Sequence, residues 1–121
     1  MFNSSQRPIY IATAPVDMRK SFDGLSVLVK NGFKKDPLDG TFFVFVNRSA
    51  DRLKILYWDR DGYALWYKRL EAGRFRIPTS DGKPAVLVSA AQLAMLLEGI
   101  EPMGIKQQKR FTLKNTEQNR S

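Results

Sequence analysis

The sequence of 121 residues contains neither cysteine nor histidine. Without cysteine there are no disulfide bonds and no thiolate chemistry. Without histidine the usual zinc sites and the Ser-His-Asp and Cys-His nucleophile systems are excluded as well. Any catalysis would have to rely on carboxylates, lysine, tyrosine or carboxylate-bound magnesium.

Long apolar runs are also missing. No window approaches 18 apolar residues, and residues 1–8 carry no apolar stretch of the kind found in signal peptides. Gly62 and Gly73 stand alone, so no glycine-rich phosphate loop is present. We therefore expect a cytoplasmic protein that has no membrane partner and binds no cofactor or metal.

Acidic residues are few relative to basic ones. Lys and Arg number 20 against 12 Asp and Glu, which gives a net charge of +8 and a pI near 10.0. Hydrophobic residues make up 43% of the chain, enough to bury a core. The charge favours a polyanionic partner such as nucleic acid, although a basic surface that serves only solubility would give the same balance.

The hydrophobic patterning predicts one α+β domain. Asp17 is expected to cap a helix over residues 18–30, and Ser89 with Gln92 to form a capping box that opens a second helix. Strands are expected over Ile9–Ala12, 41–46, 53–58, 63–70, 74–77 and 86–88. The expected fold is an antiparallel β-meander of about four to six strands with two flanking helices. We assign this domain to residues 1–103 and a basic, flexible tail to residues 104–121.

A β-hairpin at residues 59–62 decides which side chains share a face. Its Asp-Gly sequence favours a tight turn, and we expect Trp58 opposite Tyr63, although a slip of one residue would swap the two faces. One face of the hairpin then holds Leu53, Ile55, Tyr57, Ala64, Trp66, Lys68 and Leu70, and the other holds Lys54, Leu56, Trp58, Tyr63, Leu65, Tyr67 and Arg69. The first face is expected to join the core. The second mixes rings with cations, as nucleic-acid platforms do. In the alternative, each face is packed by one helix, and Lys54 and Arg69 extend to solvent.

Basic residues elsewhere add to the candidate nucleic-acid surface. Arg74 and Arg76 are predicted on one side of a strand. They would either contact successive phosphates or be solvated charges that prevent an edge strand from pairing with another chain. Arg19 and Lys20 are predicted in the first turn of the first helix, where they would either meet an anion or remain a solvated pair. The full predicted nucleic-acid-binding set is Arg19, Lys20, Arg52, Lys54, Arg60, Lys68, Arg69, Arg74 and Arg76.

Asp59 and Asp61 could in principle hold magnesium. However, both lie in the predicted hairpin turn, where Asp is expected for backbone reasons, and no third acidic residue is placed beside them. We therefore predict no catalytic residue and no metal site.

Several stretches resemble a known family. They are residues 15–20 with 22–25, residues 51–59, residues 65–71 continuing through 73–75, and residues 93–99. The sequence resembles the TnpB-type accessory protein, the second open reading frame product, of the insertion-sequence-sixty-six family, over residues 9–100. The resemblance implies a role in transposition beside a separate transposase that cuts and joins the DNA. It assigns no catalytic residue to this chain.

Two hypotheses follow. In the first, the protein is a non-catalytic accessory factor that binds element ends or non-specific duplex DNA through its basic and aromatic surface. In the second, it is an adaptor that docks on the transposase, or on a sister accessory protein, without binding DNA. Interface anchors in the second case would be Trp58, Tyr63 and Tyr67, since aromatic residues dominate binding hot spots.

Overall fold

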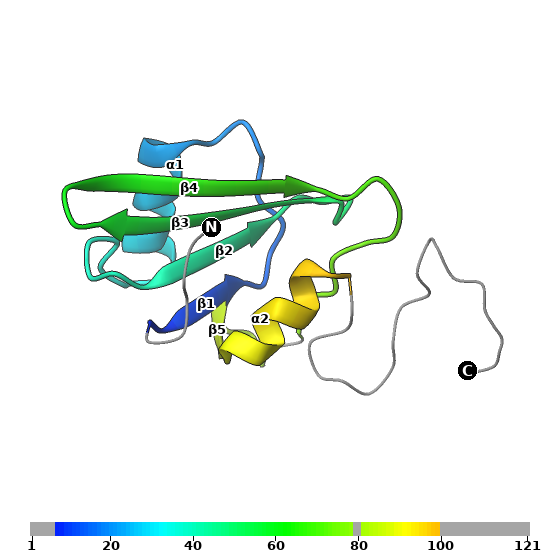
Figure 1. The fold of residues 1–121 in the computed structure, drawn as a ribbon. Helices are drawn as coiled ribbons and strands as arrows, with labels where there is room; N and C mark the ends of the chain where they lie inside the picture. Colours follow the sequence, from blue (N-terminus) through cyan, green and yellow to red (C-terminus); the bar gives the residue numbers. More distant parts are fainter. Residues whose placement is uncertain (1–6, 79–80, 100–121) are drawn as a thin grey trace, which may run out of the picture.

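The computed structural model describes residues 7–78 and 81–99, which form one sheet and two helical segments (Figure 1). The strands are β1 (Ile9–Ala12), β2 (Phe42–Val46), β3 (Arg52–Asp59), β4 (Gly62–Arg69) and β5 (Ala85–Val88). The helical segments are α1 (Phe22–Val27), which continues into the π-helical turn η1 (Leu28–Gly32), and α2 (Ala90–Leu97). The α+β class is confirmed. The predicted tail lies outside the described residues.

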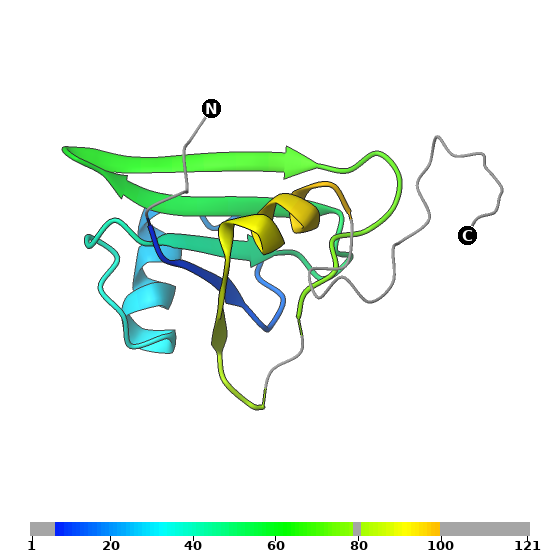
Figure 2. The ribbon, with the colours of Figure 1, turned by 60° about the horizontal axis from the view of Figure 1, so that its bottom comes forward.

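The sheet is mixed, with strand order β4-β3-β2-β1-β5. The predicted antiparallel meander is correct only for β2, β3 and β4, because β1 pairs parallel to β2. Parallel neighbours need a crossover connection, and the segment between β1 and β2 supplies it with α1 and η1. After β4 the chain returns across the sheet, and β5 pairs antiparallel with β1 at the opposite edge (Figure 2).

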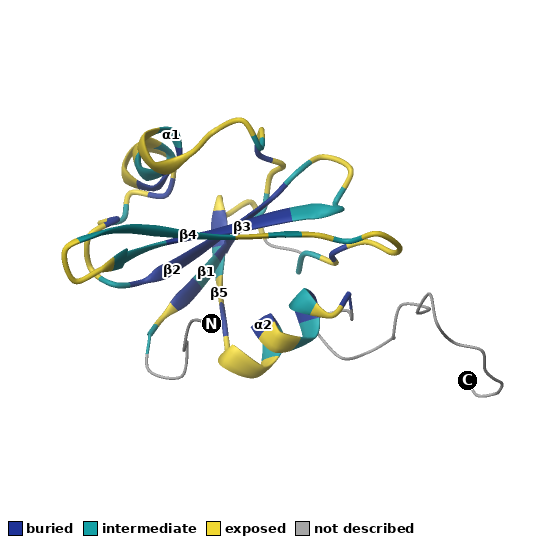
Figure 3. Cartoon of the chain, turned by 45° about the horizontal axis from the view of Figure 1, so that its top comes forward, coloured by how far each residue is buried: buried dark blue, intermediate teal, exposed yellow. Residues whose placement is uncertain are grey.

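The helical segments cover opposite faces of the sheet (Figure 3). On one face, Leu25, Val29 and Phe33 pack with strand residues such as Phe43 and Phe45. On the other, α2 places Leu93 and Leu96 over the opposite side of the same strands. Each face is therefore packed by one helical segment, as in the alternative, but only Arg69 extends to solvent, because Lys54 is buried. A sheet buried on both sides explains why β2 is apolar at every position.

The predicted hairpin register is confirmed. Trp58 pairs with Tyr63 and Asp59 with Gly62, so the two-residue turn consists of Arg60 and Asp61. Arg60 adopts a left-handed conformation, with φ of 59°, as tight hairpin turns require. The alternation of faces along β3 and β4 follows from this register.

Two predicted elements differ from the structure. The first helix begins at Phe22, four residues later than expected, because residues 17–20 form a turn instead. Residues 74–77 are not a strand: the Phe75 N–H donates to the Ala50 carbonyl (2.7 Å), while the Phe75 side chain is buried in the core under α2. The alternation of basic and apolar residues in this segment arises because the Phe75 side chain is anchored in the core, and not because the segment pairs with a strand.

The second helix begins as predicted. The Ser89 hydroxyl accepts from the Gln92 N–H (3.1 Å), and the Gln92 side chain accepts from the Ser89 N–H (2.9 Å), which forms the expected capping box. Gly99, in a left-handed conformation with φ of 79°, follows the helix and donates its N–H to the Leu96 carbonyl.

Candidate nucleic-acid interface

One end of the sheet brings together three segments that are distant in sequence. The Val16 N–H donates to the Val46 carbonyl (2.9 Å) at the end of β2, and the Leu70 N–H donates to the Asp51 carbonyl (2.8 Å). We call this region, formed by residues 13–21, 47–52 and 69–76, the loop end. The opposite region, formed by residues 34–41 and the β3–β4 turn, is called the hairpin end. These two ends differ in charge.

Basic side chains are concentrated at the loop end. They are Arg19, Lys20, Arg48, Arg52, Arg69, Arg74 and Arg76, and the carboxylates among them are Asp17, Asp51 and Glu71. All three carboxylates have partners: Asp17 and Glu71 form ion pairs with Arg19 and Arg69, and Asp51 accepts from the Asn47 amide. The hairpin end, in contrast, contains four carboxylates and three basic residues in these segments: Asp36, Asp39, Asp59 and Asp61, with Lys34, Lys35 and Arg60. Arg7 also lies toward the hairpin end, where it donates to the Trp58 carbonyl, so the two ends both carry cations but the loop end has the larger excess of positive charge.

Asn47 organises the β2–β3 loop. Its side-chain oxygen accepts from the N–H groups of Asp51 and Arg52 (both 3.0 Å), and its amide donates to the Asp51 carboxylate (2.8 Å). Ala50 in this loop has a φ of 60°, a conformation uncommon for a residue with a side chain. The sequence reasoning missed Asn47. Its role could have been predicted from its position, because an Asn in a short loop at the end of a strand often bonds the backbone with its side chain.

Arg52 and Arg69 are direct cross-strand partners on β3 and β4. Like charges in directly opposite positions destabilise a sheet. Glu71 partly balances the pair, since its carboxylate accepts from Arg69 Nε (3.0 Å) and Nη2 (2.9 Å). Nearby, Arg74 donates to the Ser49 carbonyl (2.6 Å) and is exposed, as is Arg48. An anion bound here would relieve the repulsion between the two strand arginines.

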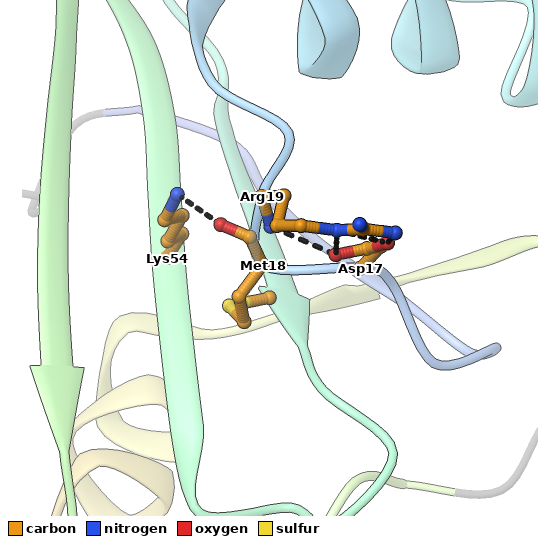
Figure 4. Close-up of polar contacts among 4 residues, drawn as sticks. All are labelled: Asp17, Met18, Arg19 and Lys54. Atoms are coloured by element: carbon orange, nitrogen blue, oxygen red, sulfur yellow. Dashed lines mark hydrogen bonds and ion pairs between the residues drawn. The ribbon is translucent and has the colours of Figure 1, made fainter.

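The Lys20 N–H donates to the Asp17 carbonyl, which closes a turn at residues 17–20, and Figure 4 shows Arg19 of this turn beside Asp17. The Asp17 carboxylate accepts from the backbone N–H of Arg19 (2.9 Å) and from its guanidinium (2.6–3.1 Å). The side-chain hydrogen bond to Arg19, with the backbone hydrogen bond, lowers the pKa of Asp17 from 3.8 to about 2. Asp17 thus does not cap the helix, and the predicted opposition between Arg19, Lys20 and the helix dipole is wrong, because both residues precede α1.

Lys54 is buried beneath this turn, with only 6% of its surface exposed. Its Nζ donates to the carbonyl oxygens of Met18 (2.7 Å) and Lys20 (2.9 Å). The expected exposed position is therefore wrong for Lys54: its ammonium group holds residues 17–20 against the sheet. This contact joins residues more than 30 positions apart, so no local sequence pattern indicates it.

The remaining predicted site residues lie elsewhere. Arg60 is at the hairpin turn, roughly 25 Å along the strand from Arg52 at about 3.3 Å per residue. Lys68 is on the opposite face, where its Nζ donates to the Leu97 carbonyl (2.8 Å) at the end of α2. Arg76 is exposed at the loop end. Trp58 and Tyr63 form an edge-to-face pair (5.2 Å between centroids) near the hairpin end, whereas Tyr67 lies beside Lys54.

Asp59 and Asp61 are exposed at the hairpin turn. Within residues 7–78 and 81–99, no group of three or more Asp or Glu side chains is arranged to hold a metal ion. Over the same residues, neither helix has the length and apolar character needed to cross a membrane.

The fold and charge distribution define a small basic α+β protein with one arginine-rich end. A family model described as "IS66 Orf2 like protein" matches residues 7–107. The chain therefore belongs to the IS66 Orf2-like family, whose members are accessory proteins of insertion-sequence transposition.

Two relatives from Sinorhizobium fredii cover most of the chain. "Uncharacterized protein y4hO" is 44% identical over 93 residues, which span 77% of this chain and 80% of the relative. "Uncharacterized protein y4jC" is 38% identical over 99 residues, which span 81% of this chain and 83% of that relative. No solved structure matches the chain significantly.

Proposed function

We propose that this protein is a non-catalytic transposition factor that binds DNA through the loop end. The observation that carries the proposal is the excess of basic side chains there, seven against three carboxylates, which remains after Asp17 and Glu71 pair with Arg19 and Arg69. Arginine presents a planar set of donors that matches phosphate oxygens, and such contacts supply affinity that is independent of sequence. The DNA would be the element ends or non-specific duplex.

The geometry supports several phosphate contacts at once. Arg52 and Arg69 extend from paired strands, whereas Arg48 and Arg74 come from loops that are hydrogen-bonded to each other. The Asn47 network and the buried Phe75 fix these loops before any ligand binds, which reduces the ordering cost of binding. In this proposal the protein acts in the cytoplasm beside the transposase of the same element, and possible further partners include a sister accessory protein.

The test is a double charge reversal, Arg74→Glu with Arg76→Glu. Both side chains are exposed, and Phe75 between them keeps its buried position. We expect affinity for any duplex to fall roughly tenfold or more at low salt, and the slope of log K against log salt to flatten by about 0.9 for each lost phosphate contact. Fluorescence anisotropy with labelled duplex, titrated across salt, measures both quantities.

A matched control reverses two charges away from the loop end, Lys30→Glu with Arg60→Glu. Lys30 lies on η1 and Arg60 in the hairpin turn, and both are exposed. This variant has the same net charge as the first, so any difference between them reports the position of the site. Equal losses of affinity in the two variants would contradict binding at the loop end.

The adaptor hypothesis is the second candidate. It is favoured by the outer edge of β4, which pairs with no other strand in the described part of the chain and could accept a strand from a protein partner. The half-buried Trp58 and Tyr63 lie on the same hairpin. An adaptor of this kind would show no affinity for DNA even at low salt.

A further inference from the structure

Tyr67 is an exposed aromatic ring on the sheet. It lies on the edge strand β4, on the face that α1 covers, with 49% of its surface exposed. Its neighbours on the same face of the strand, Tyr63 and Leu65, pack against the α1 core instead. An exposed aromatic ring at a basic end of a sheet is a feature that packing alone does not require.

The ring is held in place from one side. Lys54 is its cross-strand partner, and Lys54 Nζ lies 4.9 Å from the ring centroid. The ammonium group is itself fixed by the Met18 and Lys20 carbonyls. Tyr67 is therefore oriented by a buried contact while half of its surface stays open to solvent.

Arginines adjoin the ring along the same face. Arg69 is two residues further along β4, so its side chain points to the same side as Tyr67, and Arg52 is the direct partner of Arg69. An aromatic ring and two guanidinium groups, those of Arg69 and Arg52, therefore lie on the same face, with Arg69 two residues from Tyr67. Stacking on an aromatic ring combined with backbone contacts to cations is how proteins bind single-stranded nucleic acid.

We infer that the loop end, together with Tyr67 beside it on β4, binds single-stranded DNA, with one unpaired base stacked on Tyr67 and the adjacent phosphates contacted by Arg52 and Arg69. This inference rests on the proposed DNA binding and specifies its substrate. In a duplex, each base is paired and stacked between its neighbours, so it offers no free face to the ring. Duplex DNA would use the arginines alone.

The test compares Tyr67→Ala and Tyr67→Phe in the full-length protein, using labelled oligothymidylate and a mixed-sequence duplex of equal length. We expect Tyr67→Ala to weaken binding of the single strand roughly five- to 150-fold, the range found for loss of one stacking ring. Tyr67→Phe retains the ring and should bind both DNAs like the parent. Binding of the duplex should change little in either variant.

Several results would overturn the inference. If Tyr67→Ala weakens single strand and duplex equally, or neither, Tyr67 does not stack a base, and the proposed DNA binding still stands. If oligouridylate binds more tightly than oligothymidylate and depends more on Tyr67, the ligand is RNA. If the parent binds no nucleic acid, the proposed function fails together with the inference. As a second measurement, photocrosslinking of oligonucleotides containing 5-iododeoxyuridine should label Tyr67, and labelling elsewhere alone would contradict its role.

Discussion

Replacing Lys54 with methionine is expected to lower the free energy of unfolding by about 2–3 kcal/mol, because two carbonyls lose a charged hydrogen-bond donor. Lys54 Nζ is the donor to both the Met18 and Lys20 carbonyls, and methionine fills similar space without a donor. The turn at residues 17–20 would detach from the sheet. Urea unfolding, followed by circular dichroism, measures the change.

Lys68→Met provides the matched control. Lys68 Nζ donates to one carbonyl, that of Leu97, and lies on the opposite face of the sheet. We expect a smaller loss of stability, about 1 kcal/mol. A Lys54→Met protein as stable as the parent would show that Lys54 does not hold the turn, and a loss of DNA affinity in that stable variant would return Lys54 to the DNA surface.

The second large effect is expected for Phe45→Ala, which should lower the free energy of unfolding by about 3–5 kcal/mol, as is typical for truncating a buried Phe. Phe45 is completely buried in β2, and its ring stacks on Phe33 at 5.9 Å. Truncation leaves a cavity between the sheet and η1. A loss of this size is a large fraction of the 5–15 kcal/mol typical of a whole domain.

Phe22→Ala makes the same chemical change at an exposed site. Phe22 begins α1 with 43% of its surface exposed, so we expect its loss to cost under about 1 kcal/mol. Thermal unfolding of the two variants side by side checks the comparison. Similar destabilisation by both substitutions would contradict the layered core, in which β2 is buried between two helical segments.

The hairpin shows what local sequence can predict. The register of β3 and β4 depends on a turn of two residues, and the Asp-Gly sequence located this turn within residues 59–62, where Trp58 lies opposite Tyr63. The capping box of Ser89 and Gln92 is equally local. The bounds of the five strands that form, and the end of α1–η1 at Gly32, were also close to their predicted positions. Interactions within a few residues account for all of these.

The errors arise from contacts between distant segments. Asp17 looked like a helix cap, but Arg19 takes its carboxylate and Lys54 takes the carbonyls that follow, so the helix starts at Phe22. The alternation of apolar and polar residues likewise does not predict that β1 pairs parallel to β2. Lys54 was assigned to the DNA surface because it is a cation on a strand with aromatic residues. Only its position in the folded structure shows that its ammonium group is an internal hydrogen-bond donor.

Part of the predicted basic set lies together in the structure. Basic residues from residues 19–20, 52, 69, 74 and 76 do meet at the loop end, although they were chosen by charge alone. The sequence alone could not separate them from Arg60 and Lys68. Which end and which face of the sheet a residue occupies depends on the pairing of strands and the packing of helices.

The most direct test of the central proposal is equilibrium binding of the unmodified protein to element-end duplex and to scrambled duplex, titrated across salt. We predict binding to both at low salt, with affinity that falls steeply and linearly as log salt rises, because phosphate contacts release counterions. A clear preference for the element ends would add end recognition to this account. No binding to either duplex or to single strands at low salt would contradict it and favour the adaptor.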